Sequence, residues 1–153
     1  MTSGTTISRA DLARKLAGAG IDISRVHFTG ETYHCPPFDW LSEFALQIAF
    51  DRPSFTPGVF VCENFSRLAA HEADLAALKA GLKMHPAFGE FDGTLWPEPK
   101  PGIISVPTSH SVCICCTAEG QLITFDAQVC EDPSTLLSLD DPRCLFRPTW
   151  GRM

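Results

Sequence analysis

Apolar residues recur at helical spacing in three stretches of the chain. The first stretch follows Ser8-Arg9-Ala10-Asp11, which has the form of a capping box with Asp in place of Glu, and Gly18 and Gly20 mark its end. The second stretch follows the break at Pro36-Pro37, and the third runs from Cys62 to Gly81. The pattern predicts three amphipathic helices with these apolar faces: Leu12, Leu16 and Ala19; Trp40, Leu41, Phe44, Ile48 and Ala49; Phe65, Leu68, Ala69, Leu75, Leu78 and Leu82.

Strand-like stretches lie mainly in the second half of the chain. Residues 110–116 and 121–125 are predicted to form a hairpin around the turn Thr117-Ala118-Glu119-Gly120. Residues 21–28 and 103–106 are shorter extended candidates. Residues 85–102 contain four Pro and three Gly, which favours a loop. Helices first and a hairpin last predict an α+β fold over residues 1–153, with N-terminal helices packed on a small antiparallel sheet in a single domain.

Charge and hydropathy exclude several classes of function. The 153 residues carry a net charge of -6, and their basic residues form no cluster, so a nucleic acid is not the expected partner. No apolar stretch approaches the roughly 20 residues of a membrane helix, and the first residues lack the pattern of a signal peptide. We therefore expect no membrane partner and a cytoplasmic location.

The seven cysteines are expected to be core, metal or catalytic residues, because a reducing compartment disfavours disulfides. In a strand, Cys113 and Cys115 share one face and Cys116 lies on the other, and no second Cys/His pair follows at zinc spacing. Cys35 stands before Pro36-Pro37, where it gains no helix N-terminus. No metal and no organic cofactor is predicted.

Cys62 is the candidate nucleophile, because it begins the longest predicted helix. Free N–H groups and the helix dipole at this position stabilise a thiolate and lower the pKa of the thiol. The same N–H groups can hold a developing oxyanion. The alternative is that Cys62 is a small buried hydrophobic residue, as most free cysteines are.

His110 is the candidate general base, because a thiol nucleophile needs an imidazole and the imidazole needs an acceptor that orients it. The hairpin brings either Asp126 or Gln128 within about two positions of His110. The register of the turn decides between them, and the sequence leaves this open.

Three segments in order, Cys62-Glu63-Asn64-Phe65-Ser66, His110 and Asp126-Ala127-Gln128, resemble the papain/transglutaminase-like superfamily of cysteine peptidases, including small phage and bacterial members and the protease domain of a mushroom agglutinin. The resemblance covers residues 59–130. It implies a minimal papain-like core in which Cys62 attacks an amide carbonyl, His110 transfers protons and Asp126 orients His110. Peptidase, amidase, deamidase and transglutaminase activities all remain open, on a protein or peptide substrate with peptidoglycan peptides among the candidates.

Two features concern what would complete such a site. Thr56 stands where papain has its oxyanion-binding Gln, so a donor would come from elsewhere. Agglutinin-like relatives use calcium, yet no segment here has ligand-loop spacing. The candidate donors are Gln47, Tyr33, His34 and Trp40, and the acidic residues considered for calcium are Glu90, Asp92 and Asp132.

A second hypothesis of another class is a catalytically silent binding module, with a phage origin as one form of it, that keeps the fold as a scaffold. In that case the 85–102 loop and the aromatic Trp96 would form the recognition surface.

Overall fold

A six-stranded sheet organises the fold, with strand order β2-β8-β4-β5-β6-β7. The computed structural model describes residues 4–51, 53, 54, 56, 57, 61–97, 106–128 and 133–153. All neighbouring strands of this sheet are antiparallel except β2 and β8, which are parallel, so the sheet is mixed rather than purely antiparallel as expected. The bounds are β2 Val26–His27, β4 Phe88–Leu95, β5 Thr108–Cys116, β6 Leu122–Phe125, β7 Leu137–Ser138 and β8 Phe146–Arg152.

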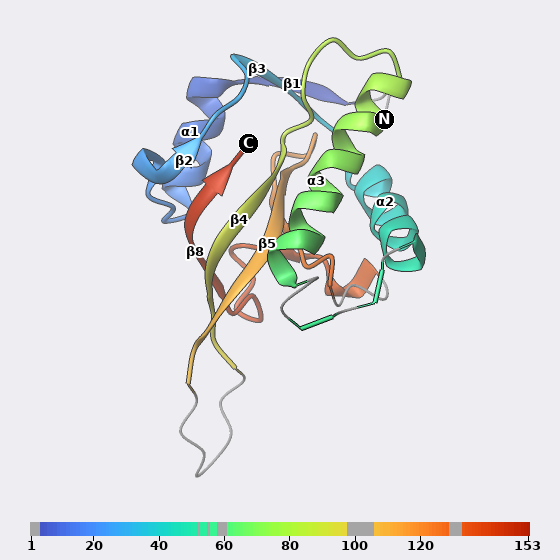
Figure 1. The fold of residues 1–153 in the computed structure, drawn as a ribbon. Helices are drawn as coiled ribbons and strands as arrows, with labels where there is room; N and C mark the ends of the chain where they lie inside the picture. The colour runs from blue at the N-terminus through green and yellow to red at the C-terminus, as the bar shows by residue number, and fades with distance from the viewer. Residues whose placement is uncertain (1–3, 52, 55, 58–60, 98–105, 129–132) are drawn as a thin grey trace.

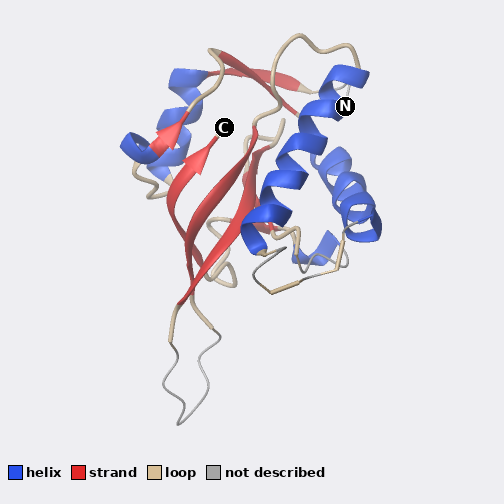
Figure 2. Ribbon diagram, viewed as in Figure 1, coloured by secondary structure: helices blue, strands red, loops and turns tan. Residues whose placement is uncertain are grey.

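Helices cover both faces of the sheet, as Figures 1 and 2 show. On one face, α1 packs with Leu12 and Leu16 against a buried cluster that includes Phe91 of β4. On the other face, α2 and α3 pack over a second cluster that includes Phe88 and Phe125. The described residues thus give an α+β fold, as predicted. The helices are α1 Arg9–Gly18, α2 Phe38–Asp51 and α3 Cys62–Lys79, with short 3-10 turns at Ile23–Arg25 and Pro133–Thr135.

The three predicted helices are confirmed, because their sequence signals are local. Gly20 and Gly81 adopt φ values of +83° and +76° just beyond α1 and α3, where a left-handed residue ends a helix. Alternation along β5 is also as predicted: Cys113 and Cys115 lie in the cluster under α2 and α3, and Cys116 lies in the cluster under α1. None of the described helices is both long and apolar enough to cross a membrane.

Ser8 caps α1, and its removal is expected to cost about 1 kcal/mol of stability. The Asp11 N–H donates to Ser8 Oγ at 3.1 Å, and Ser8 Oγ donates to Asp11 Oδ2 at 2.6 Å. Ser8→Ala loses both bonds, whereas Ser8→Asp keeps an acceptor for the N–H. Urea unfolding of the two variants tests this; equal stability of Ser8→Ala and wild type would show that the cap is not stabilising.

The predicted loop over residues 85–102 is wrong where the structure describes it, because β4 occupies Phe88–Leu95. Its glycines are needed for close strand approach rather than for a loop. A Cβ at Gly89 would meet the carbonyl oxygen of Arg152, and one at Gly93 would meet that of Arg147, both on the neighbouring strand β8. Residues 98–102 of the predicted loop, and 103–105 of the predicted strand that follows it, lie outside the described residues.

Strand pairing that links distant segments was missed from the sequence. β1 Thr5–Ser8 pairs with β3 Thr32–Cys35 in a separate two-stranded sheet. The C-terminal segment forms β8, the second strand from one edge of the main sheet, between β2 and β4. Trp150 of β8 is 42% exposed and lies outside the core.

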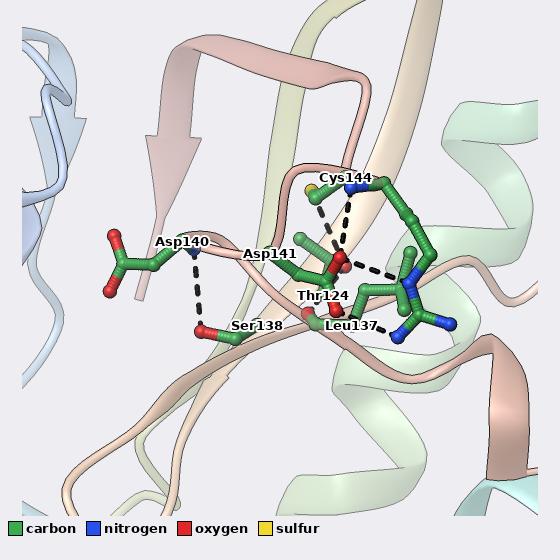
Figure 3. Close-up of polar contacts among 7 residues, drawn as sticks. Thr124, Leu137, Ser138, Asp140, Asp141 and Cys144 are labelled. Carbon is green, nitrogen blue, oxygen red and sulfur yellow. Dashed lines mark hydrogen bonds and ion pairs between the residues drawn. The ribbon is translucent and has the colours of Figure 1, made fainter. Parts of the chain in front are cut away.

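The turn between β7 and β8 is closed by polar contacts, and Figure 3 shows those that involve side chains. The Asp141 N–H donates to the Ser138 carbonyl, and the Cys144 N–H donates to the Asp141 carbonyl, at 2.9 and 2.8 Å. Thr124 Oγ1 of β6 donates to the Leu137 carbonyl at 2.8 Å and lies 3.8 Å from Cys144 Sγ. The turn is therefore tied to the end of the sheet.

Asp141 is expected to contribute to the acid dependence of stability. The side chain and N–H of Arg143 hydrogen-bond its carboxylate and lower the pKa of Asp141 to about 2. A carboxyl whose pKa is lowered on folding stabilises the fold above its unfolded value and loses that contribution as the pH falls through the folded value. Thermal melts from pH 5 to pH 2 should therefore show a shallower loss of Tm in Asp141→Asn than in wild type, and superimposable profiles would exclude the contribution.

Candidate functional site

His110, near the start of β5, and Asp126, directly after β6, contact each other. His110 Nε2 lies 2.6 Å from Asp126 Oδ2, and their side chains are only 13% and 21% exposed. The second oxygen of Asp126 accepts the N–H of Gln128 at 3.0 Å. Both carboxylate oxygens are thus held, so the carboxylate fixes the orientation of the imidazole.

The register of the hairpin explains why Asp126 rather than Gln128 contacts His110. β5 and β6 pair with Cys113 opposite Phe125, so Asp126 follows opposite Val112. Asp126 is then the diagonal neighbour of His110, within reach of a long side chain. The contact predicted from the hairpin is present, and Gln128 supplies only its backbone N–H.

Cys62 is the first residue of α3, as predicted. No side chain caps this helix from Val61; instead Asn64 Oδ1 accepts the Val61 N–H at 3.0 Å. Glu63 adds a negative charge to the first turn, which opposes the effect of the helix dipole on a thiolate. Cys62 is half-buried, whereas the other five described cysteines are buried.

α3 and β5 begin at the same end of the sheet (Figure 1). Cys113 Sγ of β5 donates to the carbonyl of Ser66, one turn into α3, at 3.2 Å. Successive side chains of a strand point to opposite faces of the sheet. His110 is therefore on the same face of β5 as Val112, which packs on the α1 side, and on the opposite face from Cys113. In the described part of the chain, no hydrogen bond joins the Cys62 thiol to His110, so the structure brings together His110 and Asp126 but does not bond Cys62 to them.

The side chains proposed as oxyanion donors are engaged elsewhere or exposed. Tyr33 is fully buried, and its hydroxyl accepts the Gly30 N–H at 2.8 Å. Trp40 stacks on Phe44 with ring centroids 4.9 Å apart. His34 is buried in β3, Gln47 is exposed on α2, and Thr56 Oγ1 donates to the Ser54 carbonyl.

The thiols of Cys35, Cys113, Cys115 and Cys116 have shifted pKa values. Burial raises the pKa of Cys113 and of Cys115 well above the usual value. Cys35 of β3 and Cys116 of β5 hydrogen-bond each other through their thiols, which raises the pKa of Cys35 and lowers that of Cys116. These thiols are packing residues, as predicted for Cys35.

The described residues contain no candidate metal site, because no three His, Cys, Asp or Glu side chains among them come close enough to hold an ion. Of the acidic residues considered for calcium, Asp92 accepts the Ser111 hydroxyl, Glu90 lies near Arg67, and Asp132 is outside the described residues. Chemically, the end of the sheet where α3 and β5 begin offers an oriented imidazole and a separate, accessible thiol.

Comparisons with known proteins identify structures of the same fold but no family. No family model matches the chain, and no curated protein matches it. Two solved structures share the fold: PSL1a in complex with E64, with a TM-score of 0.71 at 10% identity, and Polyporus squamosus lectin bound to the human-type influenza-binding epitope Neu5Aca2-6Galb1-4GlcNAc, with a TM-score of 0.67 at 9% identity. Each match covers 97% of this chain but only 51% and 49% of the solved chains, so this chain spans about half their length.

These findings overturn the assignment to the papain/transglutaminase-like superfamily. The structures that share the fold are described as a lectin and as a complex with E64, and no peptidase family model matches. The description as a cysteine protease or hydrolase with a catalytic triad falls with that assignment. Its motifs were short: a cysteine at a helix start and a histidine on a strand occur in many folds, so their order alone did not identify a family.

Proposed function

We propose that this domain is a ligand-binding module whose site is centred on His110, Asp126 and Gln128, with Cys62 at the same end of the sheet; we call this group the corner site. The observation that carries the proposal is the 2.6 Å contact between His110 and Asp126, with both side chains largely buried. The carboxylate fixes Nε2 and leaves Nδ1, which bonds none of the described residues, as one directional polar atom for a ligand. The expected ligand is a peptide or another acyl compound with a carbonyl or amide at this position.

The comparisons support a binding role in a coarse sense. Both structural titles name a bound compound, E64 in one and a sialylated trisaccharide in the other. Because this chain matches half of each solved chain, those titles do not say which half holds the compound. E64 is nevertheless a sensible first probe for the corner site.

Calorimetric titration with E64 tests the binding role. Wild type should bind, and His110→Gln should bind about tenfold more weakly or worse, because the amide lacks the oriented ring nitrogen. His27→Gln is the matched control, since His27 is exposed on β2 and distant in topology from the corner site. Equal affinity in all three proteins, or no binding to wild type, would contradict the proposal.

Thiol-dependent acyl transfer on an amide bond is the second candidate function. It is favoured because Cys62 is the one described cysteine that is not buried, and it begins a helix at the end of the sheet where His110 is oriented. In this reaction Cys62 Sγ would bond to the carbonyl carbon as the amide C–N bond breaks. The thiol proton would pass through His110 to the departing amine, and water or a second amine would then release the acyl group.

A further inference from the structure

A second polar cavity lies between α3 and the strands β4 and β8, and no residue lines both this cavity and the corner site. Its volume is about 230 Å³. Apolar side chains, including Ala70 and Phe88, form part of its wall. The ionisable lining residues are Arg67, His71, Asp74, His85, Glu90 and Arg152.

Glu90 is the unusual residue of this cavity. Its side chain is only 12% exposed, and its one ion-pair partner among the described residues is Arg67, with Nε 3.5 Å from Oε2. That distance exceeds a good hydrogen bond, and no described residue donates one to the Glu90 carboxylate. Glu90 lines the cavity, so a ligand that brings a charged donor there can form a charge-assisted hydrogen bond with its carboxylate.

Two of the other charged lining residues already pair with each other, and the remaining cations face solvent. Asp74 Oδ1 lies 2.9 Å from His85 Nδ1, and both side chains are about half exposed. Arg67 is 66% exposed, so most of its guanidinium faces solvent, and Arg152 is exposed at the end of β8. The floor is therefore acidic and the rim carries two permanent cations.

We propose that this cavity binds a small zwitterion of amino-acid size, with its ammonium group on Glu90 and its carboxylate on Arg67 and Arg152. An ammonium group supplies three donors to the carboxylate that lacks them, and a carboxylate pairs with guanidinium groups in a favourable geometry. The volume is below that of drug-sized pockets, which span roughly 300–1,000 Å³, so a compact ligand fits best. The apolar wall at Ala70 and Phe88 would contact the ligand side chain.

The test is a titration of the full chain with each of the twenty free L-amino acids, followed through the amide NMR signals. At least one should bind and shift the signals of Gly89, Glu90 and Asp74. Ethylamine and acetate, which each carry half of the zwitterion, and glucose, which carries neither charge, should bind about tenfold more weakly or not at all.

Two variants make the test specific. Glu90→Gln removes the acceptor charge and should weaken binding about tenfold or more, whereas Glu43→Gln removes a matched charge from the exposed face of α2 and should not. Ala70→Leu fills the cavity without changing charge and should block binding, which keeps the test informative if Glu90→Gln is unstable. No binding by any amino acid, equal binding of glucose, or unchanged affinity in Glu90→Gln and Ala70→Leu would overturn the proposal.

Discussion

Replacing Phe91 with alanine is expected to lower the free energy of unfolding by about 3–5 kcal/mol. The Phe91 ring is fully buried in the cluster beneath α1, on the central strand β4. It also covers Gly151 of β8, where a Cβ would collide with the ring. Truncation would therefore open a cavity over β4 and β8 that the surrounding backbone cannot fill.

Urea unfolding measures this loss, and Phe50→Ala is its matched control. Phe50 lies on α2 with 90% of its surface exposed, so the same truncation there should change stability by less than about 0.5 kcal/mol. A loss below about 1 kcal/mol for Phe91→Ala would mean that the sheet and α1 do not pack as described.

Cys62 is expected to react with iodoacetamide faster than every other described cysteine of the native protein at about pH 6.5. Cys113 and Cys115 are buried with raised pKa values, and Cys35, Cys116 and Cys144 are buried, so they should stay unlabelled until the chain unfolds. Exposure alone would explain this ranking, and a second comparison is therefore needed for the acyl-transfer candidate.

His110→Gln provides that comparison. If His110 withdraws the Cys62 proton, the variant should label about tenfold more slowly or worse, whereas His27→Gln should label like wild type. Equal rates in the three proteins would exclude acyl transfer through this pair and leave binding at the corner site as the remaining function.

The sequence predicted the parts of the fold that local signals specify. The apolar faces of α1, α2 and α3, the cap at Ser8 and the left-handed glycines at 20 and 81 are each contained within one segment. β4 was missed because Gly89 and Gly93 look like loop residues until β8 lies against them. The place of β8 between β2 and β4 depends on pairing with residues 51 to 62 positions earlier in the chain, which no local pattern reveals.

In the candidate site, too, contacts within one hairpin were predictable from the sequence, whereas contacts that depend on packing were not. The contact of His110 with Asp126 follows from a hairpin with a short turn, so the sequence could place it within two positions. The distance between Cys62 and His110 depends on how α3 packs on the sheet. Strand alternation places His110 on the α1 face, opposite the face that α3 covers. Glu90 and Arg67 carry no shared motif, and only the packing of α3 on β4 brings them together.

Mapping of the amide NMR signals that E64 perturbs in the wild-type chain tests the central claim most directly. The account predicts shifts confined to the start of α3, the start of β5 and the residues after β6, centred on Cys62, His110 and Gln128. Shifts confined to any other part of the chain, or none at saturating E64, would contradict the assignment of the corner site.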